Sequence, residues 1–128
     1  MLRQGKPSLR DIQRRVQLQN RHRIKRLSLV TPVNLMIFDL PSLKREPLMA
    51  KPWWERRERL RALMEQIPVP GALVPGGVRE YGRQFFREIV QLGLEGIVAK
   101  HVDGPYLPAK RCGYWLKVKV KGYDGKRE

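Results

Sequence analysis

Cysteine is almost absent from this chain, because Cys112 is the only one among 128 residues. A single thiol cannot form an internal disulfide, and the N-terminus, with Arg3 and Lys6, lacks an apolar signal core. Apolar runs long enough to span a bilayer are also missing, and no metal-ligand grouping surrounds His22 or His101. The sequence therefore predicts a reduced, cytoplasmic protein with solvated histidines, comprising one domain or part of one.

Acidic residues are scarce as well. Only 12 Asp and Glu stand against 27 Lys and Arg, giving a formal net charge of +15 and a pI near 10.8. The basic residues are spread over predicted helices and strands instead of forming one tail. Such an excess attracts polyanions through salt-sensitive contacts, so nucleic acid is the expected partner.

Apolar residues at helical spacing predict helices that begin near Pro7 and Ser8, near residue 20 and near residue 78. Ser8 and Asp11 have the spacing of a capping box for the first helix. The second, over residues 20–30, should have a cationic outer face. The helix at 78–92 should bury one edge, formed by Tyr81, Phe85, Ile89 and Leu92.

A further helix over residues 52–64 should be the longest. Pro52 suits its start, and Leu60, Leu63 and Met64 form an apolar stripe. Two tryptophans at its entrance, Trp53 and Trp54, fit a hydrophobic staple better than a base-stacking platform. Its arginines are expected to face water; they include Arg56, Arg57 and Arg59.

Residues 33–40 read V-N-L-M-I-F-D-L, an almost continuous apolar run. This length is typical of a buried strand, so we expect the run in the core. A buried carboxylate without a partner is costly, and Asp39 must therefore reach water or a partner. From the residues alone, Phe38 is an ordinary core aromatic.

The last third of the chain contains two more strand patterns, E-G-I-V-A-K at 95–100 and Y-W-L-K-V-K at 114–119, which predict a hairpin-like pair. Alternation places Trp115, Lys117 and Lys119 on one face, with two ammonium groups about 7 Å apart, a spacing that suits a phosphate. Gly96 leaves room for a ligand or another backbone to approach. Spacing alone fits solvated lysines on an amphipathic strand equally well.

These two strands and the loop between them, with Asp103-Gly104-Pro105-Tyr106 and Lys110-Arg111, resemble motifs IV and V of ATP-dependent DNA ligases, closest to bacterial and archaeal repair enzymes. RNA ligases and capping enzymes share looser versions, and the W-L-K-V-K ending favours DNA ligase. Upstream, T-P-V followed by F-D-L resembles motif IIIa, and residues 5–15 resemble the segment after motif III. The resemblance covers nearly the whole chain.

A nucleotide site follows from this resemblance. Phe38 would stack on adenine, Lys117 and Lys119 would contact the nucleotide phosphate, and Lys100 would lie at the same site. Glu95 would help to hold a metal, so ATP and Mg²⁺ are the implied cofactors. Five residues is an odd separation, and a regular strand would point Glu95 and Lys100 to opposite faces; either the strand is irregular or one role is wrong.

The implied fold is α+β, an antiparallel sheet with flanking helices, forming an incomplete covalent-nucleotidyltransferase (ATP-grasp-like) adenylation domain over residues 1–128. The family's K-x-D-G-x-R motif, whose lysine attacks ATP, does not occur in the sequence, and neither does the expected oligonucleotide-binding-fold domain. Residues 121–127 read K-G-Y-D-G-K-R, which is that motif with one residue inserted. A chance continuation and a circular permutation both fit this tail.

The resemblance thus implies part of an ATP-dependent DNA ligase that binds nucleotide and nicked double-stranded DNA in repair or recombination. We expect it to be inactive without the missing N-terminal half, so that the chain either works with a separately encoded half or is a truncated remnant. The alternative is a non-catalytic nucleic-acid-binding protein on the same scaffold.

Overall fold

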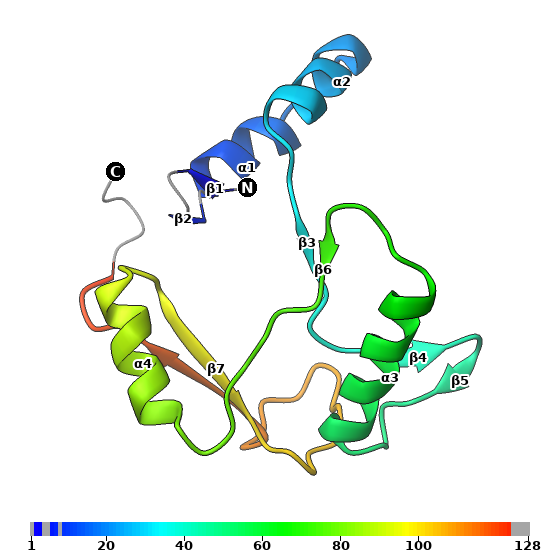
Figure 1. Ribbon diagram of the computed structural model, residues 1–128, viewed down its shortest axis with the longest axis vertical. Helices are drawn as coiled ribbons and strands as arrows, with labels where there is room; N and C mark the ends of the chain where they lie inside the picture. The colour runs from blue at the N-terminus through cyan, green and yellow to red at the C-terminus, as the bar shows by residue number, and fades with distance from the viewer. Residues whose placement is uncertain (1, 4–5, 8, 124–128) are drawn as a thin grey trace. The chain divides into compact units, whose positions relative to one another are not determined.

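The computed structural model describes residues 2–3, 6–7 and 9–123, which form two compact units. The first unit contains the described residues up to Met36 together with Val69–Leu73. The second contains Ile37–Pro68 and the described residues from Val74 onward. Helices and strands are mixed along the chain, as predicted, and the strands form small two-stranded sheets (Figure 1). In the described part, no helix is long and apolar enough to cross a membrane.

Two helices and two short sheets make up the first unit. Its elements are β1 (Leu2–Arg3), β2 (Lys6–Pro7), α1 (Leu9–Val16), α2 (Arg21–Val30), β3 (Leu35–Met36) and β6 (Ala72–Leu73). Strands β1 and β2 are antiparallel, whereas β3 and β6 are parallel. Both helices predicted in this part of the sequence are confirmed.

The ends of α2 have identifiable causes. Asn20 caps its start, because the side chain accepts hydrogen bonds from the amides of His22 and Arg23. The helix ends before Thr31, which precedes a proline and is therefore disfavoured in helical conformation. The capping box predicted for α1 involves Ser8, which lies outside the described residues.

The apolar run at 33–40 is not the buried strand that the sequence predicted. Only Leu35 and Met36 form a strand, and these residues are 65% and 49% exposed. The boundary between the two units falls between Met36 and Ile37, so the apolar residues of the run do not share one core. Local hydrophobicity cannot report such a division.

The second unit contains two further helices and two antiparallel strand pairs. Its elements are β4 (Ser42–Leu43), β5 (Glu46–Pro47), α3 (Trp53–Gln66), α4 (Gly82–Gln91), β7 (Gly96–Lys100) and β8 (Trp115–Lys119). Helix α3 is the longest among the described residues, as predicted. The expected single antiparallel sheet is not formed by the described residues, since four separate strand pairs take its place.

Helix α4 leads directly into the predicted hairpin. Gly93 adopts a positive φ of 67° after the helix, and the amides of Gly93 and Leu94 donate to the carbonyls of Val90 and Ile89. This is a Schellman cap, which ends a helix and redirects the chain. Strand β7 follows, packs against α4 and pairs antiparallel with β8 (Figure 1).

The buried edge predicted for α4 is only partly correct. Ile89 is buried and Phe85 is partly buried, but Tyr81 and Leu92 are 67% and 56% exposed. The helix also begins at Gly82 instead of near residue 78, so Tyr81 precedes the first turn.

Two arginines belong to the small core, contrary to prediction. Among the described residues, the buried hydrophobic side chains are those of Leu48, Leu60 and Ile89. Arg56 and Arg57, expected to face water, are 0% and 7% exposed. Both arginines lie three or four residues from Trp53 on one side and from Leu60 on the other. Residues at this spacing are neighbours on a helix surface, so Arg56 and Arg57 lie on the buried stripe of α3.

Candidate functional site

One face of the β7–β8 hairpin carries most of the predicted site residues. Alternation along β8 puts Trp115, Lys117 and Lys119 on this face. The register pairs Lys100 with Trp115 and Gly96 with Lys119, and directly opposed residues share a face. Lys100, Lys117 and Lys119 therefore lie on one surface.

Lys100 is held in an aromatic cage, which we define as the rings of Phe38, Trp53 and Trp115. Its Nζ lies 5.0 Å, 5.8 Å and 4.0 Å from those three ring centroids, within the range of cation–π attraction. The same Nζ donates a hydrogen bond of 3.0 Å to the carbonyl oxygen of Phe38. Burial lowers the pKa of Lys100 to about 8.

Phe38 is not an ordinary core aromatic. It is 53% exposed, and its ring meets Trp115 edge-on, with centroids 6.1 Å apart at 73°. A residue from the first third of the chain is thus brought onto the C-terminal hairpin with about half of its surface exposed. A half-exposed ring beside a lysine suits stacking on a planar ligand.

Glu95 and Lys119 form an ion pair at the other end of the face. Their Oε1 and Nζ atoms are 2.9 Å apart, and the side chains are 60% and 66% exposed. The hydrogen bond from Lys119 is the main cause that lowers the pKa of Glu95. Lys117 adds a smaller electrostatic contribution of the same sign.

Gly96 explains how Glu95 reaches the face that carries Lys119, although regular alternation along a strand would point Glu95 away from the face of Lys100. Its φ is +151°, and a β-carbon there would come within 2.2 Å of the Val118 carbonyl oxygen. Only glycine tolerates this conformation and this close approach of the opposite backbone. The strand is thus irregular at Gly96, which is one of the two alternatives that the odd spacing left open, and the roles of Glu95 and Lys100 stay predictions.

An anchor that the sequence did not predict lies beside this face. Arg56 donates from Nε and Nη2 to the two carboxylate oxygens of Asp39, at 2.8 Å and 2.9 Å. Asp39 thereby has the partner that its position requires, and its side chain is 2% exposed. The spacing of Arg56 from Trp53 and Leu60 is the sequence signal that could have found the anchor.

Trp53 combines structural and site contacts. Its ring lies 6.0 Å from the Arg57 guanidinium and forms one wall of the aromatic cage. The indole nitrogen is buried without a hydrogen-bond partner in the described part of the chain. Trp54 differs, because it is 39% exposed. Trp53 packs as predicted, but it also belongs to the site.

The hairpin face offers a single acidic side chain for a metal, that of Glu95. No three His, Cys, Asp or Glu residues gather anywhere in the described ranges. Mg²⁺ usually keeps several waters and binds through one or two carboxylates plus substrate phosphates. Glu95 therefore fits a metal that arrives with a phosphate ligand.

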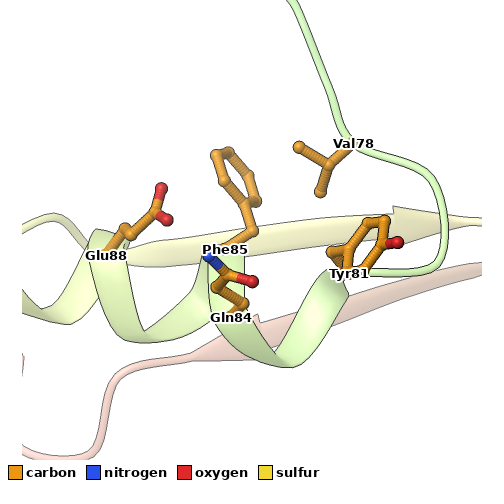
Figure 2. Close-up of a pocket in the computed structure, with 5 residues that line it drawn as sticks. All are labelled: Val78, Tyr81, Gln84, Phe85 and Glu88. Carbon is orange, nitrogen blue, oxygen red and sulfur yellow. The ribbon is translucent and has the colours of Figure 1, made fainter.

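A separate pocket lies along α4. Figure 2 shows its lining, which consists of Val78, Tyr81, Gln84, Phe85 and Glu88. None of the predicted site residues lines this pocket, so it is not part of the hairpin face.

Comparison with known proteins gives one consistent result. Residues 3–119 match the family described as the ATP dependent DNA ligase domain. "DNA ligase 1" of Korarchaeum cryptofilum is 40% identical over 89 residues, which are 69% of this chain and 16% of that protein. "DNA ligase" of Nanoarchaeum equitans is 31% identical over 105 residues, covering 80% and 18%. "Probable DNA ligase" of Dictyoglomus thermophilum is 32% identical over 113 residues, covering 86% and 19%. The chain thus spans less than a fifth of the length of these three relatives.

Proposed function

The chain belongs to the ATP-dependent DNA ligase domain family, and from this premise we propose that the β7–β8 face binds ATP within the adenylation domain of a ligase. The observation that carries the proposal is the gathering of Phe38, Lys100, Lys117, Lys119 and Glu95 at one face of one hairpin. The family resemblance supplied the roles of these residues, and the geometry adds that they lie together.

The two ends of the face suit the two ends of a nucleotide. Trp115 and Lys119 are four residues apart on β8, roughly 13 Å along an extended strand. We assign the adenine to Phe38, at the aromatic end, and the phosphates to Lys117 and Lys119, at the cationic end. Lys100 lies against the Phe38 ring and adds positive charge on the same surface.

The Glu95–Lys119 ion pair is expected to separate when nucleotide binds. Lys119 would then donate to phosphate oxygens, and Glu95 would provide one carboxylate ligand for Mg²⁺. When bound, Mg²⁺ would neutralise charge on the nonbridging oxygens of the phosphate. Lys117 and Lys119 supply fixed positive charge to the same group of oxygens.

The whole reaction that we propose is the sealing of nicked double-stranded DNA in repair or recombination. The lysine that becomes adenylated must come from a K-x-D-G-x-R segment, which these 128 residues do not contain. We propose that another segment of the protein or a separately encoded chain supplies it. The described residues then contribute nucleotide binding and cationic contacts to DNA.

An NMR titration tests the nucleotide site. Isotope-labelled chain is titrated with ATP and Mg²⁺, and amide shifts should move at β7, β8 and Phe38. Shifts confined to the α4 pocket, or no shifts at millimolar ATP, would contradict the assignment.

A second candidate function, nucleic-acid binding without catalysis, is favoured by α2. This helix has no acidic residue, and its four exposed cations are Arg21, Arg23, Lys25 and Arg26. Binding of nicked DNA that persists after loss of ATP binding would favour this candidate.

A further inference from the structure

Arg56 forms the most extensive polar contact set described in the second unit. Its guanidinium is fully buried and makes two hydrogen bonds to Asp39. Nη1 donates to two backbone carbonyl oxygens, those of Lys51 and Gly104, the latter at 3.2 Å. One side chain therefore joins the start of its own helix to two segments that are distant in sequence, those of Asp39 and Gly104.

The segment of Asp39 contributes directly to the aromatic end of the hairpin face. Asp39 directly follows Phe38, and its carboxylate also accepts from the amide of Leu40 at 2.8 Å, which fixes the backbone at this point. The carbonyl of Phe38 in turn holds the ammonium group of Lys100.

The segment of Gly104 reaches the same end through Tyr106. The Arg56 guanidinium lies 5.9 Å from the Tyr106 ring, and that ring meets Trp115 edge-on at 5.5 Å and 88°. Trp115 contacts both Phe38 and Lys100. Arg56 thus supports the aromatic cage from two sides.

From this arrangement we infer that Arg56 is a positioning residue for nucleobase recognition, acting through Asp39 on Phe38 and through Gly104–Tyr106 on Trp115. The inference rests on the nucleotide site proposed above, and it adds a residue that touches no ligand. Arginine is required because its planar fork donates to a carboxylate and to backbone carbonyls at once. Lysine keeps the charge but cannot reproduce that fork.

Arg56→Lys tests the inference when the chain is titrated with two probes, ATP and inorganic triphosphate. Only ATP offers a base to the aromatic end, whereas both offer phosphates to Lys117 and Lys119. We expect ATP affinity to fall about tenfold, which is the effect of losing one charge-assisted hydrogen bond. The affinity for triphosphate should stay unchanged. Equal changes for both probes, or no change for either, would overturn the inference.

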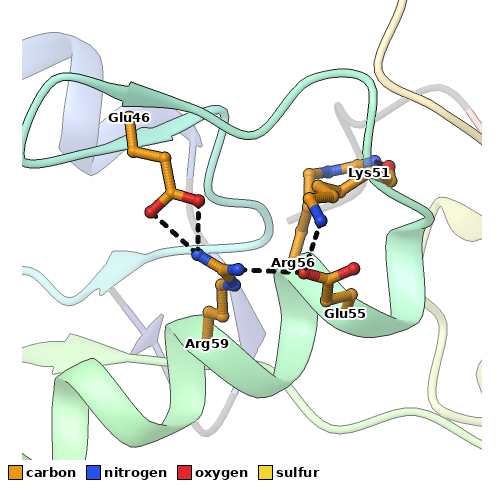
Figure 3. Close-up of polar contacts among 5 residues, drawn as sticks. All are labelled: Glu46, Lys51, Glu55, Arg56 and Arg59. Carbon is orange, nitrogen blue, oxygen red and sulfur yellow. Dashed lines mark hydrogen bonds and ion pairs between the residues drawn. The ribbon is translucent and has the colours of Figure 1, made fainter.

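Arg59→Lys is the matched control. Arg59 lies on the same helix and also pairs with carboxylates, those of Glu46 and Glu55, while Lys51 pairs with Glu55 beside it (Figure 3). Its side chain is 33% exposed, and its contacts do not include the aromatic cage. This variant should leave the ratio of ATP to triphosphate affinity unchanged.

A double variant covers the case in which Arg56→Lys does not fold. Arg56→Met combined with Asp39→Leu removes both charges together, a change that buried ion pairs often tolerate. A folded double variant with a lowered ATP-to-triphosphate ratio supports the inference, and one with the wild-type ratio refutes it.

Phe38→Leu separates the inference from the proposed function. If this variant leaves ATP affinity unchanged, the proposed base site is wrong. If it weakens ATP while Arg56→Lys does not, only the positioning role fails.

Discussion

Removal of the Asp39 carboxylate should strongly destabilise the second unit. Asp39→Ala would leave the Arg56 guanidinium, which is 0% exposed, without its anionic partner. Breaking a buried pair from one side costs about 3–5 kcal/mol. Small domains are stable by only about 5–15 kcal/mol in total, so we expect loss of roughly a fifth or more of the free energy of unfolding. The double replacement, Asp39→Leu with Arg56→Met, should recover most of it because no charge stays buried.

Urea unfolding, monitored by tryptophan fluorescence, measures the loss of stability in the second unit. All three tryptophans, Trp53, Trp54 and Trp115, belong to the second unit. Glu46→Ala is the control, because it breaks the exposed pair with Arg59 and should shift the midpoint little. If Asp39→Ala and Glu46→Ala shift the midpoint equally, the buried pair does not stabilise this unit as we argue.

Three further predictions concern chemistry and charge. Incubation with α-labelled ATP should give no covalent adenylate on the isolated chain. Label on Lys121 would favour a circularly permuted nucleophile motif, whose residues 124–127 lie outside the described part. Label on Lys117 would overturn its role as a phosphate contact. DNA binding should weaken steeply with salt and show little sequence preference, and a flat plot of log affinity against log salt would remove nucleic acid as the leading partner. NMR should show Lys100 titrating near pH 8. Because the unfolded state holds that proton up to about pH 10.5, stability should rise between pH 8 and 10.5 while ATP affinity falls. Titration near 10.5 in the folded chain would contradict the desolvation of Lys100 by its surroundings.

The helices and the hairpin could be predicted because their signals are local. Alternation in W-L-K-V-K and the turn residues before it specify a strand pair, and the structure confirms it. The Schellman cap at Gly93 likewise depends on neighbouring residues. The strand expected at 33–40 failed because its environment is set by a division between units, which is not a local property.

The site was predictable in part for the same reason. Lys117 and Lys119 share a face through strand geometry alone, whereas Phe38 reaches Lys100 only through a contact between residues 62 positions apart. The roles of these residues came from family resemblance and stay predictions. Arg56 was predicted to face water because it is charged, although its position between Trp53 and Leu60 places it on the buried side of the helix. A buried arginine needs a distant carboxylate, and sequence spacing does not reveal which one.

Nucleotide affinity of lysine variants tests the central claim most directly. Arg57, which the sequence predicted to face water, would have been a natural control, but it is 7% exposed and its Nη2 donates to the carbonyl of Pro75. Arg87, an exposed cation on α4, replaces it. In an NMR titration with ATP and Mg²⁺, Lys117→Ala and Lys119→Ala should each weaken binding about tenfold or more, and Arg87→Ala should barely change it. Comparable losses at all three positions would mean that ATP responds to general positive charge and that the hairpin face is not its site.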